Sequence, residues 1–585
     1  MKEVKSQPEA PRALDEGKIM CDVLGGGNWI RAINRGYLCL LLFLAPLKFG
    51  LVVGTMEVSL FPTTTWEWLL TVWPPWLLPP LAGVGLILSL AASRRVVCPR
   101  GVGLVSWVWL LVLAGALPGL VRTTEWDTAQ QFVWHLIGAA CMALAVRRTV
   151  QADREARGWL LAAVVAGGVL AALSGWNQVV FGGYERTLAG AREQGVALSS
   201  AMVDRMTQGR ASGPFVYPNS LAAHLVLVLP MALVALWRAA SWFEPVRVSR
   251  GLFVFCGGAA LGIGLVLSGS RAGIAAGVAG VVCAIALMPG LRRWRMPVLL
   301  LVLAFGVAAG VAINRGRGLS SLEARGDYYR ACVQMGTTHP ATGVGLGEFF
   351  PWYMHLKPEA AENTRRPHSF LLGFFAQSGV FGAVAAMVCL SLPLWFRRAL
   401  RGGGWTIDAA MGLAVLAGTA AWSLHSLLDF NVHIPGTLAT VAALPFLCGA
   451  PSEEGVPAST GGQRSWRGTF ALAIVAILGI WRVPGELAYA RQTTLMQAPQ
   501  VAAKRRVARA AEQACRLLPL SPYPCWLRGL YARQNGDSDE AIRAFEQTVR
   551  RAPHREAFRK ALIEELRAVG NSEKARQVAE KDWKP

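Results

Sequence analysis

The sequence has 585 residues, of which 53% are hydrophobic and 16% are charged. Soluble domains carry about 25% charged residues, so this composition excludes an ordinary soluble globule. The net charge of +22 does not indicate a nucleic-acid partner, because the basic residues lie mostly in short loops between apolar runs, where they act as topology signals. We therefore predict an all-α, polytopic transmembrane helical bundle that binds no nucleic acid.

The first 34 residues are polar and mixed in charge, and we expect a cytoplasmic N-terminal segment at 1–34 without a cleavable signal peptide. Between residues 35 and 484, apolar runs of about 20 residues are each long enough to cross a hydrocarbon core of about 30 Å. The fused run 251–289 and the proline-broken run 67–92 leave the count at about 12 to 13. The predicted spans are 36–54, 67–92, 102–120, 130–146, 159–181, 214–237, 251–269, 271–289, 297–313, 369–396, 408–427, 432–449 and 467–484.

The arginines of five short loops set the orientation of these spans. With thirteen spans, all five loops lie on the side of the N-terminus, and the positive-inside rule makes that side cytoplasmic. The loops 182–213 and 314–368, the turn His425–His433 and everything after the last span then face outward. The five loops contain Arg94, Arg95 and Arg100; Arg147, Arg148, Arg154 and Arg157; Arg238, Arg247 and Arg250; Arg292, Arg293 and Arg295; and Arg397, Arg398 and Arg401.

Two outward-facing loops carry more positive charge than this rule favours. Loop 182–213 has four arginines, and loop 314–368 has seven basic residues against five acids. Long loops cross the membrane regardless of charge, so a solvated surface explains the pattern without a function. The functional interpretation is that the arginines hold an anion outside, because the planar guanidinium group pairs well with phosphate oxygens. Either interpretation fits the sequence at this point.

The polar stretch Arg325–Gly382 ends where a new apolar run begins. It holds three of the eight histidines and a GVGLG turn at 343–347. His368 stands at the outer start of that run, where a histidine can take a proton from a sugar hydroxyl near neutral pH. The alternative role is a hydrogen-bonded helix cap. Arg365 and Arg366, just before it, either steer an anion or face water.

Arg271 lies in a Ser-Gly-Ser-Arg-Ala-Gly motif between two apolar runs. An arginine in or at the edge of a bilayer costs at least about 3 kcal/mol, so it normally pairs or lines a wet cavity. Either it holds a phosphate at the outer leaflet, or its side chain reaches the lipid headgroups. Arg210 opens the segment Arg210–Ala222, in which Pro218 suits a first helical turn and Asn219 can satisfy free backbone N–H groups. Taken alone, that segment is helix-start chemistry.

The segment His425–His433 contains two histidines and an aspartate. His425 and Asp429 are four residues apart, so we expect them on one helical face, where they can hydrogen-bond. A metal site that includes His433 lacks an evident fourth ligand, and a structural pair is favoured. The eleven cysteines are scattered without CxxC or CxxH spacing, so we predict neither disulfides nor bound metal.

The tail, residues 485–585, contains an internal repeat. Pro519 and Pro553, Gly536 and Gly570, and Ala541 and Ala575 are each 34 residues apart. This period is typical of tetratricopeptide-like helical hairpins, in which small residues allow close packing and Phe545 fills the interface. We predict a small soluble α-helical repeat domain on the outer side. Its concave surface either binds a protein partner or is helical bulk without one.

Five short motifs, in this order and with this topology, resemble the O-antigen ligase and O-antigen polymerase superfamily of bacterial envelope enzymes. The resemblance covers roughly residues 200–450, and the earlier spans match only in hydropathy. The motifs are GPFVYPNSLA (213–222), SGSRAG (268–273), Arg325 followed by HPATGVGLGEF (339–349), PHSFLLGFFAQSGVFG (367–382) and HSLLDF (425–430).

Proteins of this superfamily transfer a glycan from an undecaprenyl-diphosphate carrier to a hydroxyl acceptor at the periplasmic face of the bacterial inner membrane, without a metal or other cofactor. The resemblance implies a GT-C-related fold for residues 35–484 and an inverting glycosyltransferase. It implies that His368 activates the acceptor hydroxyl, and that Arg271, Arg325 and Arg210 hold the diphosphate. Ser369 stands where an asparagine often follows the histidine, and either residue can cap the helix.

The resemblance leaves the acceptor open among lipid A–core, a glycan and a protein hydroxyl. An O-antigen ligase is favoured, with a polymerase or a protein glycosyltransferase as alternatives, and Arg330, His425 and Asp429 are candidates for supporting roles. A non-catalytic transporter or assembly scaffold lies outside this class. A transporter is expected to place charged or broken segments at mid-membrane, whereas here the charges gather in outward loops. A scaffold leaves the outward arginines unexplained.

Overall fold

The structure is a computed structural model. It describes residues 28–54, 64–92, 100–153, 155–193, 200–240, 247–287, 293, 296–297, 319–401, 405–407, 409–447, 449–451, 462–496 and 504–581.

The all-α polytopic architecture is confirmed. Seven helical segments among the described residues are long and apolar enough to cross a membrane. They contain α2 (Asn28–Lys48), α4 (Leu78–Ala92) with η1 (Pro75–Leu77), α6 (Trp126–Ala152), α7 (Ala156–Val179), α10 (Pro218–Ala239), α16 (Phe370–Leu390), and α20 (Gly462–Leu478), which continues through η7 (Gly479–Arg482) into α21 (Val483–Met496).

Shorter helices fill several other predicted spans. The span predicted at 432–449 is broken into η5, α19 and η6, and at about 1.5 Å per residue the nine residues of α19 cannot cross the membrane alone. They are buried inside the bundle instead. The predicted span 297–313 lies, apart from its first residue, outside the described residues. The shorter elements are α5 (Arg100–Ala116), η2 (Leu117–Arg122), α11 (Arg247–Leu267), α12 (Arg271–Leu287), α17 (Leu392–Arg401), α18 (Ala409–Ser426), η5 (Asn431–His433), α19 (Pro435–Ala443) and η6 (Leu444–Phe446).

Small residues let the helices of the bundle approach closely. A Cβ atom added to Gly418 of α18 would lie 2.2 Å from the carbonyl oxygen of Leu227 in α10, so only glycine fits there. Such contacts replace the hydrophobic driving force that helices lack in lipid. Outside the helices, one antiparallel pair of short strands, β1 (Trp405–Ile407) and β2 (Gly449–Pro451), joins two loops.

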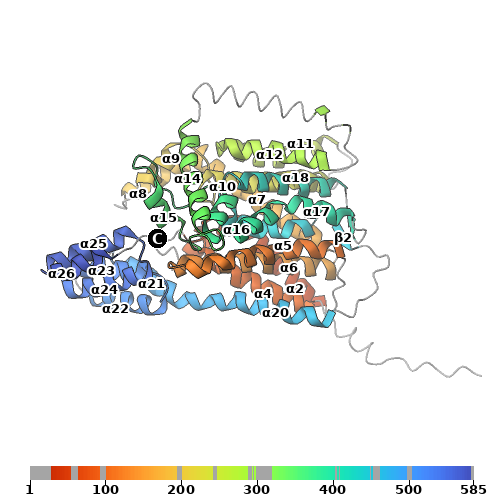
Figure 1. Ribbon diagram of the computed structural model, residues 1–585. Helices are drawn as coiled ribbons and strands as arrows, with labels where there is room; N and C mark the ends of the chain where they lie inside the picture. Colours follow the sequence, from red (N-terminus) through yellow and green to blue (C-terminus); the bar gives the residue numbers. More distant parts are fainter. Residues whose placement is uncertain are drawn as a thin grey trace, which may run out of the picture.

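The polar loops and the repeat helices gather at one end of the bundle (Figure 1). The loops predicted at 182–213 and 314–368 form short helices there, and the blue repeat helices lie beside the same end. The strands and α17 lie at the other end (Figure 1). The elements at the first end are α8 (Gly183–Glu193), α9 (Ser200–Thr207), α14 (Leu319–Thr338), α15 (Phe349–Leu356), α22 (Lys504–Leu517), α23 (Tyr523–Gln534), α24 (Ser538–Arg551), α25 (Glu556–Ala568) and α26 (Ser572–Glu580), while α3 (Thr65–Leu70) precedes η1.

The 34-residue period of the tail has a structural counterpart. Gly536 and Gly570 both have positive φ, at 76° and 78°, in the turns that join α23 to α24 and α25 to α26. Asp537 and Asn571, the next residues, both cap the following helix through their side chains. Phe545 is fully buried, and a Cβ atom on Gly529 would meet its ring at 2.5 Å. The tail therefore has its own core of repeated helical hairpins.

Candidate functional site

His368 has a backbone conformation that no other described non-glycine residue shares. Its φ is 45°, in the left-handed region that favours glycine. Such strained positions persist where the surrounding structure holds them, often at functional sites. The next residue, Ser369, is the N-cap of α16, and its hydroxyl accepts a hydrogen bond from the N–H of Leu372 at 3.3 Å. The cap is thus made by Ser369, and the His368 side chain is available for another role.

Two aromatic rings and one hydroxyl hold His368 in place. Its imidazole stacks on Tyr328 of α14 with ring centroids 5.6 Å apart, and it meets Phe430 edge-on at 4.8 Å. The hydroxyl of Tyr329 donates a hydrogen bond to the backbone carbonyl of His368 at 3.2 Å. About a quarter of the His368 side chain (26%) is exposed, so its position is fixed while one edge of the ring stays accessible.

Asp429 faces the Nδ1 atom of the His368 ring. Its Oδ1 atom lies 3.4 Å from Nδ1 of the imidazole, an ion-pair distance that is long for a hydrogen bond. Burial alone would raise the pKa of Asp429, but His368, His425 and the N–H of Phe430 together lower that pKa well below its usual range. An ionised carboxylate at Nδ1 favours the tautomer with its proton there. Nε2 is then the basic nitrogen, and none of the described residues pairs with it.

A chain of hydrogen bonds links Asp429 to Arg210. The Asn219 side chain donates from Nδ2 to Oδ2 of Asp429 at 2.9 Å. Its Oδ1 atom accepts from Nη2 of Arg210 at 3.1 Å. Arg210 also donates from Nε to the carbonyl of Ser268 at 3.0 Å. Four of the five sequence motifs thus meet at this site, although they are far apart in the chain.

Arg271 and Arg325 add positive charge to the same site. Arg271 is the first residue of α12 and is exposed. Burial lowers the pKa of the Arg210 guanidinium, and the nearby charge of Arg271 lowers it further. Arg325, half-buried on α14, partly offsets the rise that burial causes in the pKa of the Tyr329 hydroxyl. Arg271 therefore lies near Arg210, and Arg325 lies near the tyrosine that binds the His368 carbonyl, so the site gathers positive charge that suits an additional anion.

The predicted pairing of His425 and Asp429 on one helical face is wrong. Helix α18 ends at Ser426, so Asp429 lies in the turn beyond it. The buried His425 ring instead has its Nδ1 atom 2.8 Å from the amide of Asn431. Asp429 is freed for His368, although its charge still reaches His425. The supporting role predicted for Asp429 therefore has a different geometry from the one expected.

Two other candidate residues, Arg330 and His433, have partners in other parts of the structure. Arg330 is exposed and pairs with Asp327, one turn before it on α14, at 2.6 Å. The ring of His433 stacks on Phe132 at 4.6 Å within the bundle. No group of three metal-ligating side chains is found in the part of the chain that the structure describes.

The GVGLG segment forms the backbone turn that its glycines predict. Gly343, Gly345 and Gly347 all have positive φ. The N–H of Gly347 donates to the Gln377 side chain of α16 at 2.8 Å, and the N–H of Leu346 donates to the carbonyl of Gly119 at 3.0 Å. This turn fastens the large loop to the bundle, which keeps α14 and its two tyrosines against His368.

Sequence reasoning missed the roles of Asn219 and Tyr328. The position of Asn219 after Pro218 indicated helix capping, whereas the structure places its amide between Arg210 and Asp429. An amide side chain can donate and accept hydrogen bonds at once, and this property could have indicated that Asn219 links a basic residue to an acidic one. Tyr328 lies on a helix whose contacts with residues 40 positions later are set only by the fold.

The sequence profile of the O-antigen ligase family matches residues 256–387. This region runs from α11 to α16 and includes Arg271, Arg325 and His368. No curated protein matches the chain. Residues 256–387 are therefore similar to the O-antigen ligase family, and the predicted resemblance to the ligase and polymerase superfamily is confirmed over that region.

Proposed function

We propose that this protein transfers a glycan from an undecaprenyl-diphosphate carrier to a hydroxyl acceptor, with His368 as the general base. The observation that carries the proposal is the hydrogen-bonded chain from Arg210 through Asn219 to Asp429, which ends 3.4 Å from His368. It joins a cluster of guanidinium groups, suited to a diphosphate, with an oriented imidazole.

The reaction follows from this geometry. The acceptor oxygen attacks the anomeric carbon while Nε2 of His368 takes its proton. The bond between the anomeric carbon and the phosphate oxygen breaks, and its electron pair leaves with the lipid diphosphate. Asp429 stabilises the imidazolium that forms. Arg210, Arg271 and Arg325 stabilise the developing charge on the diphosphate in place of a divalent ion. Attack from the face opposite the leaving group inverts the anomeric carbon.

Replacement of His368 and Arg271 tests this mechanism. His368→Ala and Arg271→Ala should each abolish transfer, because one removes the base and the other a diphosphate contact. The measurement is glycan transfer by membranes that contain equal amounts of each variant. His355→Ala is the matched control, since His355 is an exposed histidine of the same loop. Full activity in either variant would remove that residue from the mechanism.

The preferred acceptor is lipid A–core, which makes the protein an O-antigen ligase acting at the periplasmic face of the inner membrane. The gathering of the large loop and the repeat helices at one end of the bundle supports a single active face. A gene deletion followed by gel analysis of envelope glycans tests the choice. Loss of long glycan from lipid A with polymer left on the carrier supports a ligase. Single-repeat products identify a polymerase, and unchanged lipopolysaccharide with loss of glycoproteins identifies a protein glycosyltransferase.

A further inference from the structure

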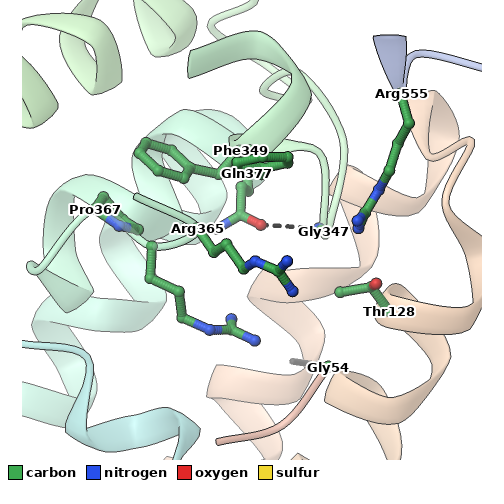
Figure 2. Close-up of a pocket in the computed structure, with 10 residues that line it drawn as sticks. Gly54, Thr128, Gly347, Phe349, Arg365, Pro367, Gln377 and Arg555 are labelled. Carbon is green, nitrogen blue, oxygen red and sulfur yellow. Dashed lines mark hydrogen bonds between the residues drawn. The ribbon is translucent and has the colours of Figure 1, made fainter. Parts of the chain in front are cut away.

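A second group of arginines lies next to His368 and is not used by the proposed reaction. Arg365 and Arg366, from the large loop, line a cavity together with Arg555 of the repeat helices. Figure 2 shows Arg365 and Arg555 entering the cavity from different elements, with both guanidinium groups directed toward Thr128. The cavity volume of about 30 Å³ is enough for about two water molecules.

Arg366 is partly buried, with its Nε atom shielded from solvent, and it lacks a balancing charge. One of its terminal nitrogens donates to the carbonyl of Val53, and its Nε atom has no hydrogen-bond partner. Within the described parts of the chain, no carboxylate lies at ion-pair distance from it. Burial lowers the pKa of Arg366 to about 10, so the group is still charged at neutral pH. A buried charge without a counter-charge is costly, and an anion in the cavity would offset that cost.

Arg555 brings the repeat helices to this cavity. Its Nε and Nη2 atoms donate to the two carboxylate oxygens of Glu125 at 2.7 and 2.8 Å. The two side chains are 12% and 4% exposed, so the pair is nearly dry. The guanidinium also lies 5.5 Å from the ring of Phe350. The start of α6 and the loop before α25, 430 residues apart, are joined at the cavity wall.

The charges around the cavity leave an excess of positive charge. Glu125 neutralises Arg555, whereas Arg366 has no carboxylate at ion-pair distance within the described residues. The adjacent Glu348 accepts hydrogen bonds from the N–H groups of Thr124 and Glu125, and burial, with the Glu125 charge, raises its pKa to about 7. Glu348 therefore supplies less than a full negative charge at neutral pH. The uncompensated charge of Arg366 suits the oxygens of one phosphate or carboxylate group.

We propose that this cavity binds a single anionic group, a phosphate or a carboxylate, of a sugar substrate, and that the repeat helices complete it through Arg555. It shares no lining residue with the cluster of Arg210, Arg271 and Arg325. One of its lining residues, Pro367, directly precedes His368 in the chain. The assignment of the anion to a substrate rests on the proposed function, whereas the binding of the anion does not.

Phosphate binding tests the cavity directly. Inorganic phosphate is titrated calorimetrically into purified full-length protein in detergent at constant ionic strength. The Arg271→Ala background removes a contact of the other cluster. Arg365→Gln should weaken binding about tenfold or more, because it removes a charge-assisted contact. The double variant Glu125→Gln with Arg555→Gln keeps the net charge and should weaken binding less, through the loss of an Arg555 N–H contact alone. The double variant removes the buried pair together, so it leaves no uncompensated charge from that pair.

Arg550→Gln is the matched control, since Arg550 is an exposed arginine of α24. Thermal unfolding confirms that each variant is folded. Unchanged phosphate affinity in both cavity variants would overturn the proposal.

Competition then identifies the source of the anion. Displacement of phosphate by glucosamine 6-phosphate, lost in Arg365→Gln, indicates an anionic sugar of the acceptor or glycan. Displacement of phosphate by undecaprenyl diphosphate, also lost in Arg365→Gln, indicates the lipid carrier of the donor. Displacement by neither probe contradicts a substrate site. A protein that binds phosphate in the cavity but transfers no glycan would refute the proposed function alone. Transfer with phosphate affinity unaffected by the cavity variants would refute this inference alone.

Discussion

Asp429 beside His368 and Glu348 beside Glu125 are two carboxyl groups in buried surroundings, and their pKa values move in opposite directions. Burial raises the pKa in both places. At Asp429, two histidines and a backbone N–H overcome that effect and keep the carboxylate charged. At Glu348, the neighbouring Glu125 adds to burial, and its hydrogen bonds only partly compensate. Neighbours therefore decide whether a buried carboxyl is a fixed charge for catalysis or a group that titrates near neutral pH.

Replacement of Asp429 should give the largest effect. Asp429→Asn keeps the shape of the side chain but removes the charge that orients His368 and stabilises its imidazolium, so we expect transfer to fall by about two orders of magnitude or more. The rate is measured against a lipid-linked donor at several pH values, with protein abundance in the membrane as the control. A rate within tenfold of wild type would show that His368 acts without this partner.

Removal of Arg555 should have the next largest effect, on stability. Arg555→Gln leaves Glu125 buried without its partner beside Glu348, which is expected to cost about 3–5 kcal/mol. We expect earlier thermal unfolding and faster proteolysis between the bundle and the repeat helices. Adding Glu125→Gln should recover part of the loss, because the uncompensated charge is then gone. Equal stability of the single and double variants would contradict an uncompensated Glu125 charge as the cause of the loss.

Titration of Glu348 should produce a smaller, pH-dependent effect. Its folded-state pKa of about 7 lies above the ordinary value of 4.5, so the folded protein binds more protons than the unfolded chain between these values. The contribution of Glu348 to stability is therefore present at low pH and is lost as pH rises through about 7. Melting temperatures at pH 5, 6, 7 and 8 should decline less in Glu348→Gln than in wild type. Parallel curves would contradict the shift.

Arg330 should show the smallest effect. It is 79% exposed, and its described ion pair is with Asp327; exposed pairs contribute about 0–1 kcal/mol. Arg330→Gln should retain transfer within about twofold and leave the melting temperature unchanged. A strong loss of transfer, compared with Arg325→Gln in the same assay, would return Arg330 to the site.

The helical class was predicted from the sequence and is confirmed, and the loops predicted to be polar lie at one end of the bundle. Arg210, Arg271, Arg325 and His368 stay predicted site residues, which the sequence singled out because charge between apolar runs is costly and conspicuous. Asp429 was predicted to pair with His425, but the structure places it beside His368. The end of α18 at Ser426, which causes the difference, depends on packing and not on spacing.

Contacts across long stretches of chain could not be predicted. Arg555 and Glu125 are ordinary residues in their own segments, and only the docking of the repeat helices makes them a buried pair. The number of helices that cross the membrane could not be predicted from hydropathy either. Apolar runs that form short buried helices have the same hydropathy as runs that cross the membrane.

The positive φ of His368 has a consequence for how this protein balances stability against activity. A non-glycine residue in that conformation costs about 1–3 kcal/mol. A glycine at the same position would adopt the φ of 45° without that cost, but it would have no imidazole. The chain therefore gives up folding free energy at the one backbone position where its proposed base must stand. Variants selected only for thermal stability should tend to replace this histidine first.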